Sequence, residues 1–394
     1  MLVDVTDTCV TPALTGIQSL THGLVEGLAA AGVRQRLVRW SPRRRAFVPL
    51  RPRESDRFSS VAGEAKYLPL RPLLTFLQAR GSSSRVPIHL HPRHAPELNG
   101  SWLLLPEVLN ADEAAAMLRY AREHGVRTAA VFHDAIPVTH PHLVNAEASA
   151  AHLRYMRELC AADVVLPVST FSAAAFAEIA RREGRLLPPL RVCREAAEVA
   201  GVSRAAAAEC KSSRVLCVAS LDPRKNHAVL LDAFEIVCRE LPESDTELHL
   251  VGDVYKPAPA AADAVVQATQ RNPRIEWHGR VDREQLHALY RTCAFTVYPS
   301  LLEGFGLPVV ESLWFGKPCI CSDAGPMGES AIGGGCITVD VQNPRAIAAA
   351  MLMLLTNSER YRELVQQACT RPLKTWRAYA AEICDVLASV PARG

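Results

Sequence analysis

The most informative segment of this 394-residue chain reads Glu303-Gly304-Phe305-Gly306-Leu307-Pro308-Val309-Val310-Glu311. It follows an apolar run, 295–299, and the apolar residues after it end at Gly316. The pattern predicts a strand, then a turn whose two glycines let the backbone approach a ligand, and then a short helix that Pro308 opens. Loop amides and a helix N-terminus favour phosphate, and carboxylates accept hydrogen bonds from sugar hydroxyls. The segment therefore indicates a sugar-nucleotide site, and the alternative is a solvated turn with two surface glutamates.

The length and composition are those of a folded protein with two domains. A chain of 394 residues exceeds one ordinary core, and 49% hydrophobic with 22% charged residues is typical of a folded soluble chain. The net charge of +3 argues neither for nor against nucleic-acid binding, and we expect no nucleic-acid partner. Twelve cysteines without a CxxC pair favour reduced thiols in a cytoplasm over a disulfide framework or a cysteine metal site. The sequence has no apolar run of membrane-spanning length and no signal-like N-terminus, so we expect a cytoplasmic protein.

Arginine is concentrated near the N-terminus. Nine arginines lie between Arg34 and Arg57, and only Glu54 and Asp56 oppose them in that segment. Such a cluster suits anionic lipid head groups at the inner face of the cytoplasmic membrane, or an acidic acceptor. The alternative is a solvated, arginine-rich loop.

Short apolar runs alternate with helical patterns along the chain, which predicts parallel sheets covered by helices. The strands are expected at 2–5, 36–38, 102–105, 128–132 and 163–168, and then at 214–219, 247–251, 275–278, 295–298 and 318–321. The pattern weakens over 188–213, which predicts a linker between a domain of residues 1–200 and a domain of residues 201–373. A last amphipathic helix lies within residues 374–394. Residues 42–99 read as irregular connections with one helix near 73–77.

Two adjacent cations mark the nucleotide side of the second half. Arg224 and Lys225 follow the strand at 214–219 and precede a helix, where they can clamp a diphosphate. Ser220 lies in the same strand-end loop, and Gly252 ends the next strand where the chain turns beside a ligand. A solvated pair of cations is the alternative.

The first half offers a possible catalytic pair. His133 and Asp134 follow the strand at 128–132, where His133 can meet a sugar hydroxyl or a developing charge and Asp134 can orient it or accept a proton. The alternative is a structural histidine beside a capping aspartate. Gly16 follows Thr15 at the start of the first helix, where amides can meet a phosphate, although Thr15 also suits a simple N-cap. No metal site is expected, because neither histidine spacing nor paired aspartates suggest one.

Together these motifs resemble the retaining glycosyltransferases of family four, the glycosyl transferases group 1. The resemblance rests on Asp222-Pro223-Arg224-Lys225-Asn226, His278-Gly279-Arg280-Val281, the run from Tyr298 to Pro308, and Phe132-His133-Asp134. It implies the α/β GT-B fold, in which two Rossmann-like domains with parallel sheets face one another and a C-terminal helix crosses back onto the first.

The resemblance also implies a role for each site residue. Glu311 would bind the ribose, and His133 would lie near the reacting carbon. Glu303 would hold the transferred sugar with the amides of Phe305, Gly306 and Leu307. Arg224 and Lys225 would neutralise the leaving diphosphate in place of a metal. The chain departs from the family pattern at Ser220 and in the loop 325–329, where Glu329 is the expected nucleotide-side residue.

The implied activity is metal- and cofactor-independent transfer of a hexose from a nucleotide diphosphate sugar, with retained configuration. The acceptor would be a glycan or a lipid-linked oligosaccharide in bacterial surface polysaccharide or lipopolysaccharide synthesis. GDP-mannose is the expected donor, and a UDP-hexose is the alternative. A nicotinamide oxidoreductase is disfavoured, since no Gly-x-Gly-x-x-Gly follows a strand, and a non-catalytic nucleotide-sugar-binding protein stays open.

Overall fold

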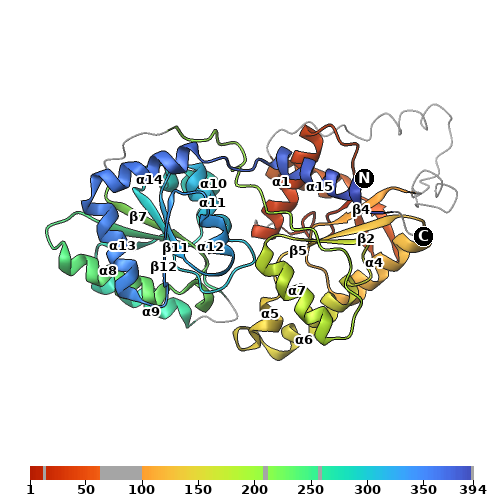
Figure 1. Ribbon diagram of the computed structural model, residues 1–394, viewed down its shortest axis with the longest axis horizontal. Coiled ribbons are helices and arrows are strands. Elements are labelled where there is room, and N and C mark those ends of the chain that lie inside the picture. The colour runs from red at the N-terminus through yellow and green to blue at the C-terminus, as the bar shows by residue number, and fades with distance from the viewer. Residues whose placement is uncertain (12–14, 63–99, 207–211, 256–259, 392–394) are drawn as a thin grey trace.

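The computed structural model describes residues 1–11, 15–62, 100–206, 212–255 and 260–391, and shows two α/β domains (Figure 1). Each domain has a six-stranded sheet, in the order β3-β2-β1-β4-β5-β6 in the first and β12-β11-β10-β7-β8-β9 in the second. The first sheet contains β1 (Leu2–Asp4), β2 (Arg36–Ser41), β3 (Ala46–Pro49), β4 (Trp102–Leu105), β5 (Arg127–Phe132) and β6 (Val164–Pro167). The second contains β7 (Arg214–Val218), β8 (Glu247–Val251), β9 (Ile275–Trp277), β10 (Phe295–Tyr298), β11 (Cys319–Ser322) and β12 (Cys336–Val339).

Helices cover both sheets. Those of the first domain are α1 (Gly16–Ala30), α2 (Pro52–Ala62), α4 (Ala111–Glu123), α5 (Ile136–Thr139), α6 (Ala146–Leu159) and α7 (Thr170–Arg182). Those of the second are α8 (His227–Glu240), α9 (Ala261–Arg271), α10 (Arg283–Thr292), α11 (Leu307–Trp314), α12 (Gly325–Ala331), α13 (Pro344–Thr356) and α14 (Ser358–Thr370). Short 3-10 turns, η2 (Pro141–Leu143) and η3 (Pro223–Lys225), follow α5 and β7, and α15 (Trp376–Ser389) is the last helix. None of the helices in the described ranges is long and apolar enough to cross a bilayer.

Polar side chains define where several helices begin. Asn110 accepts a hydrogen bond from the Glu113 amide at 2.9 Å, and Asp282 accepts one from the Gln285 amide at 2.8 Å. Ser169 caps α7 in the same way. Each cap satisfies an amide that has no partner within its helix. Asn, Asp and Ser are residue types that favour the N-cap position, and Asn110, Asp282 and Ser169 occupy it in α4, α10 and α7.

Every strand predicted from an apolar run is present, but two further strands were missed. Residues 42–99 were expected to be irregular, and the described part of this region instead holds β3 and α2. The edge strand β3 pairs antiparallel with β2, and its buried Phe47 packs against Trp40 with ring centroids 5.0 Å apart. The second missed strand, β12, follows three glycines and pairs with β11. The helix expected near 73–77 lies outside the described residues.

The segment expected to link the domains begins as part of the first one. Leu190 forms a parallel bridge with Val165, and the Cys193 amide donates to the Pro167 carbonyl at 2.9 Å. Residues 190–193 therefore extend the edge of the first sheet beside β6, before the chain reaches the second domain.

The last helix crosses back to the first domain, where α15 lies beside α1 (Figure 1). Two glycines of α1 make room for it. A Cβ at Gly23 would lie 2.1 Å from the Trp376 ring, and one at Gly27 would lie 2.2 Å from the Trp376 carbonyl oxygen. Glu198 holds the same tryptophan, since its carbonyl accepts from the indole Nε1 at 2.9 Å and its carboxylate from the Trp376 amide at 2.8 Å. Two Rossmann-like domains with a returning helix are the arrangement expected from the sequence.

Replacing Gly27 by alanine tests this packing. Alanine normally favours a helix over glycine by about 0.5–1 kcal/mol, but here the overpacking cost of about 1–3 kcal/mol should outweigh that gain. We expect a lower Tm in thermal unfolding. The exposed Ala29 of the same helix offers the control, because Ala29→Gly should show only the propensity loss of about 0.5–1 kcal/mol. A Gly27→Ala protein as stable as wild type would contradict the packing account.

Candidate active site

The strand-end loops of the two domains meet at Gly304. A Cβ at this position would lie 2.3 Å from the carbonyl oxygen of His133, which follows β5 of the other domain. The Ser172 hydroxyl contacts both sides, since it is 2.8 Å from the His133 carbonyl oxygen and 3.3 Å from that of Gly304. Only glycine permits this close approach of two backbones. Gly304 of the second domain and His133 of the first therefore lie at one interface.

Glu303 and Lys225 form an ion pair within the second domain, with each side chain only 13% exposed. The Glu303 Oε1 atom also accepts hydrogen bonds from the Tyr298 hydroxyl at 2.6 Å and from the Ser300 hydroxyl. Burial raises the pKa of the Glu303 carboxyl, but the Lys225 ammonium and these hydroxyls outweigh burial, so the pKa is lowered overall. All these contacts go to Oε1, and within the described ranges Oε2 has no hydrogen-bond partner. An ionised carboxylate is thus fixed with one oxygen available to a ligand.

Arg224 is held by its own loop. Its Nε and Nη2 atoms lie 3.1 and 2.7 Å from the carboxylate of buried Asp222, which also accepts from the Arg224 amide at 2.9 Å. Burial by itself would lower the pKa of the guanidinium. The Asp222 carboxylate raises this pKa by more than burial lowers it, so the pKa of Arg224 lies above its ordinary value. Asn226 adopts the left-handed conformation (φ 58°) that turns η3 into α8. Arg224 and Lys225 therefore lie in a preorganised turn, and each is paired with a carboxylate, Asp222 and Glu303 respectively.

The turn before α11 presents unpaired amides. Gly306 has φ 94°, a conformation that favours glycine, and the helix begins at the next residue. The amides of Phe305, Gly306 and Leu307 make no hydrogen bond in the part of the chain that is described. Amides at a helix N-terminus attract anions and polarised oxygens. The turn predicted from the sequence is therefore present, with free donors at its helix end.

Glu311 lies inside α11, where its Oε2 accepts from the buried Tyr290 hydroxyl at 3.2 Å. Burial raises the pKa of this carboxyl, and the hydrogen bond from Tyr290 lowers it only in part. The pKa of Glu303 is therefore lowered and that of Glu311 raised, because Glu303 has a cationic partner and Glu311 has a neutral one.

His133 is buried at the domain interface. Its Nε2 is 2.8 Å from the Pro106 carbonyl oxygen, and its Nδ1 is 3.9 Å from Glu195 Oε1. Burial lowers the pKa of His133 and raises the pKa of Glu195 to about 8, with a smaller contribution from Glu311. Both groups are shifted toward their neutral forms, so this contact is not an ion pair at neutral pH. Asp134 accepts from the Ile136 amide at 2.9 Å, so this carboxylate has a structural role in the turn before α5, whose N-cap is Ala135.

The remaining predicted residues lie around this interface. A Cβ on Gly16 would lie 3.5 Å from Leu307 Cδ1, which places the start of α1 opposite the Glu303 turn. A Cβ on Gly252 would lie 1.9 Å from the Ala219 carbonyl oxygen, next to Ser220. Gly252 thus has a packing role between the β7 and β8 loops, whatever it does for a ligand.

Several site residues were not found from the sequence. Glu195 and Glu107 lie in segments without a recognisable motif, and only the fold buries them beside the loops that follow β5 and β1. The Glu107 carboxylate accepts from the amides of Asp7 and Thr8 at 2.8 and 2.7 Å. Tyr298 was read as a strand residue, and its hydroxyl at a strand end was the available signal for a polar role.

Glu329 joins the two domains. Its carboxylate accepts from the amides of Thr170 and Phe171 at 3.1 and 3.0 Å and lies 3.4 Å from Arg194. A carboxylate at the start of α7 also interacts favourably with the helix dipole. In this conformation Glu329 contacts the first domain, whereas it was expected on the nucleotide side.

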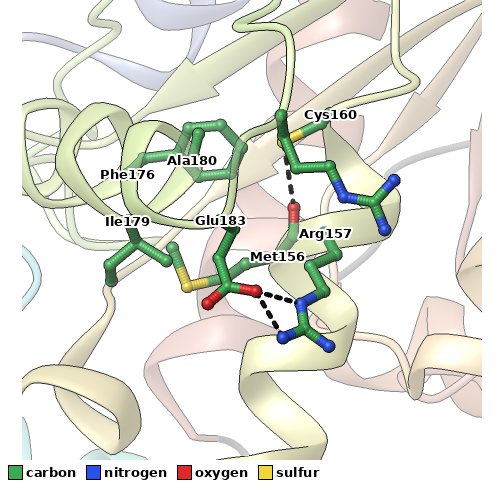
Figure 2. Close-up of a pocket in the computed structure, with 8 residues that line it drawn as sticks. Met156, Arg157, Cys160, Phe176, Ile179, Ala180 and Glu183 are labelled. Atoms are coloured by element: carbon green, nitrogen blue, oxygen red, sulfur yellow. Dashed lines mark hydrogen bonds and ion pairs between the residues drawn. The ribbon is translucent and has the colours of Figure 1, made fainter.

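A hollow between α6 and α7 lies away from this interface. Figure 2 shows Met156, Phe176 and Ile179 along it, with the Arg157–Glu183 ion pair at its side. The hollow encloses no space for a water molecule. It is a packing defect at the surface rather than a binding site.

Parts of the chain are similar in sequence to known proteins. Residues 203–371 match the family model of glycosyl transferases group 1. The chain is 31% identical over 173 residues to O-antigen chain mannosyltransferase B of Escherichia coli, and 29% identical over 187 residues to the MMP alpha-(1->4)-mannosyltransferase of Mycolicibacterium hassiacum. These matches cover 43% and 46% of this chain, and they span only 42% and 44% of the two relatives.

Solved structures are similar over nearly the whole chain. HepE of Anabaena in complex with UDP and glucose has a TM-score of 0.64 at 14% identity, covering 98% of this chain and 99% of that one. Sucrose-phosphate synthase from Thermosynechococcus elongatus has a TM-score of 0.65 at 19% identity, covering 98% of both chains. These likenesses confirm the GT-B fold.

The buried Glu195 carboxyl predicts a pH-dependent stability. Between about pH 4.5, its ordinary pKa, and about pH 8, its pKa in the fold, the unfolded chain ionises this group while the folded protein keeps its proton. The folded state therefore loses stability as pH rises through this window, by about 1.4 kcal/mol per pH unit at most.

A glutamine at this position cannot ionise. In thermal unfolding, the Tm of Glu195→Gln should therefore exceed that of wild type by an amount that grows from pH 5 to pH 8 and then levels off. Glu284→Gln, on the exposed face of α10, should show no such trend. A constant difference for Glu195→Gln across this range would refute the neutral buried carboxyl.

Proposed function

Because residues 203–371 match the family model of glycosyl transferases group 1, we propose that the protein is a glycosyltransferase. It transfers a hexose from a nucleotide diphosphate sugar to a hydroxyl of a glycan or lipid-linked acceptor. The observation that supports this most strongly is the fixed Glu303 carboxylate. Its Oε1 is held by Lys225, Tyr298 and Ser300, and among the described residues neither its Oε2 nor the amides of the following turn have a hydrogen-bond partner.

The two sets of groups suit different parts of a sugar nucleotide. The Glu303 oxygen accepts from sugar hydroxyls while the amides of the turn donate to the sugar and phosphate oxygens. Glu311 lies one helix turn or more further along α11 and suits the ribose hydroxyls. Arg224 and Lys225 supply positive charge at the adjacent strand end, where the diphosphate would lie.

The reaction breaks the bond between the anomeric carbon and the diphosphate oxygen. Negative charge then develops on the leaving diphosphate, and Arg224 and Lys225 stabilise it in place of a metal ion. The acceptor oxygen forms its bond on the face that the diphosphate leaves, and its proton passes to the departing phosphate oxygen, so the configuration is retained. His133 supports the sugar at the domain interface, and closure of the two domains would exclude water from the reacting centre.

Mannose from GDP-mannose is the proposed donor group, supported by the relatives named as mannosyltransferases in Escherichia coli and Mycolicibacterium hassiacum. A UDP-hexose is the second candidate, because the similar HepE structure contains UDP and glucose. The O-antigen relative also supports a role in surface polysaccharide synthesis.

A peripheral, cytoplasmic position at the inner membrane face fits the exposed arginines of the β2–β3 turn. Arg43, Arg44 and Arg45 are exposed there, whereas Arg39 is paired with Glu54 at 3.0 Å. Exposed cations on one edge of the acceptor-side domain suit a lipid-linked acceptor in an anionic membrane.

A thermal-shift panel of GDP, UDP, ADP and dTDP in EDTA tests the donor site. A ligand that binds only the folded state raises stability by about 2.7 kcal/mol at one hundred times its Kd, so the cognate base should give the largest rise in Tm. GDP is expected to do so. A largest rise with UDP would replace the mannose proposal by the UDP-hexose one, and no rise with any nucleotide would refute the donor site.

Glu303→Gln tests the carboxylate itself. Glutamine keeps the shape but leaves Lys225 without its anionic partner and weakens the contact to the sugar. We expect sugar transfer from the cognate donor to fall by about 10²–10³, while the protein stays folded by circular dichroism. The exposed Glu284→Gln is the matched control and should keep wild-type activity. Transfer by Glu303→Gln at the wild-type rate would contradict the assignment, and proton NMR of the wild-type product would report whether the anomer is retained.

A further inference from the structure

Two Glu-x-His triplets lie on neighbouring strands of the second sheet, outside the proposed donor site. Glu247-Leu248-His249 belongs to β8, and Glu276-Trp277-His278 covers the end of β9, which is the edge strand. Since side chains alternate along a strand, the glutamate and histidine of each triplet share one face. The parallel register sets His249 opposite Glu276. Four ligand-type side chains are therefore gathered on one face at the edge of the sheet.

Three of these side chains converge on one point. His249 Nδ1 lies 2.8 Å from His278 Nε2 and 3.6 Å from Glu276 Oε2. One ligand atom of each residue lies within 4.8 Å of the other two. In a tetrahedral zinc site with bonds of about 2.0–2.1 Å, neighbouring ligand atoms are about 3.3 Å apart. The observed separations lie on either side of that value, so small side-chain rotations would suffice to close the site.

The fourth side chain, Glu247, contacts the ring nitrogen of His249 that faces away from the shared point. Glu247 Oε2 lies 3.2 Å from His249 Nε2, and Arg214 Nε lies 3.1 Å from the same oxygen. With its proton on Nε2, His249 donates to this carboxylate and directs the lone pair of Nδ1 at the shared point, where it accepts the hydrogen bond from His278 Nε2 that a metal ion would replace. A carboxylate on the second ring nitrogen is the usual support of a metal-binding histidine.

His278 can also place its ring proton on the nitrogen that does not face the shared point. His278 Nδ1 lies 3.4 Å from Glu276 Oε1, so the ring can carry its proton there and use Nε2 as a ligand. His249 is only 5% exposed and its neighbour on β7 is the buried Leu216, whereas Glu276 is 61% exposed in its side chain. The point is therefore anchored in the fold on one side and open to solvent on the other.

We propose that His249 Nδ1, His278 Nε2 and the Glu276 carboxylate bind one divalent transition-metal ion, with water completing its coordination. Imidazole and carboxylate ligands in this number suit Zn²⁺. The ion would join β8 to the edge strand β9 and brace the following Gly279, whose carbonyl accepts from the Gly252 amide at 2.9 Å. This role is structural and separate from the proposed leaving-group contacts of Arg224 and Lys225, so it does not depend on the proposed reaction.

Metal titration of the full chain, first treated with chelator, tests the site. Isothermal titration with Zn²⁺ should give one site per chain, and Zn²⁺ should raise the Tm. Glu247→Gln should weaken binding by roughly 10–100-fold, as the loss of a supporting carboxylate does, and His278→Asn by at least as much. His249 is too buried for a safe substitution, and Glu284→Gln on nearby α10 is the matched control, with unchanged affinity.

Absorption with Co²⁺ separates this site from the cysteines. Histidine and carboxylate ligands give only weak visible bands, whereas thiolates add an intense charge-transfer band in the near ultraviolet. The site would be supported if wild type with Co²⁺ gave the weak visible bands without a thiolate band, and if His278→Asn lost these visible bands. A thiolate band, wild-type affinity in His278→Asn, or no binding by the wild type would each overturn it.

Discussion

A buried carboxylate that must stay charged organises the candidate active site. Glu303 has a side chain only 13% exposed, and it remains ionised because Lys225, Tyr298 and Ser300 all contact its Oε1. Removing one member of such a buried pair typically costs about 3–5 kcal/mol, since the other charge is left without compensation. The pair thereby locks the loop after β7 to the loop after β10, and the Leu301 amide reinforces the join by donating to the Arg224 carbonyl at 2.8 Å. Gly304, the next residue after Glu303, is then held where it meets the first domain.

The two domains use the same α/β unit to produce opposite electrostatic surroundings. Strand ends of the second domain carry paired charges, with Arg224 on Asp222 and Lys225 on Glu303. The first domain contributes groups that burial shifts toward neutrality, namely His133 and, near the start of the linker, Glu195. This division suits the proposed reaction, in which the second domain binds the charged diphosphate and the sugar hydroxyls while His133 of the first domain packs against the sugar. Glu329 and Ser172 connect the halves, so the asymmetry is assembled only when the domains are together.

The two Glu-x-His triplets illustrate a different use of the sheet. Edge strands expose unpaired backbone groups and need some form of protection, and β9 is only three residues long. Polar side chains on its face contact His249 of β8. His249 in turn contacts Glu247, which pairs with Arg214 of β7, so the short edge strand is held to the inner strands. The same register that pairs β8 with β9 thus creates a ligand set that neither triplet has by itself.

Local sequence patterns were sufficient for most strands, for the caps Asn110 and Asp282, and for the Gly306 turn with Pro308, because each depends on residues within a few positions of one another. They were also sufficient to place Arg224, Lys225 and Glu303 at strand ends. Patterns failed for β3 and β12, whose short runs become strands only by pairing with β2 and β11. The pairing of Lys225 with Glu303, the burial of Glu195 beside His133 and the meeting of His249 with Glu276 were decided by tertiary structure. Each joins residues at least 27 positions apart in the sequence, and only strand register and domain contact determine such distances.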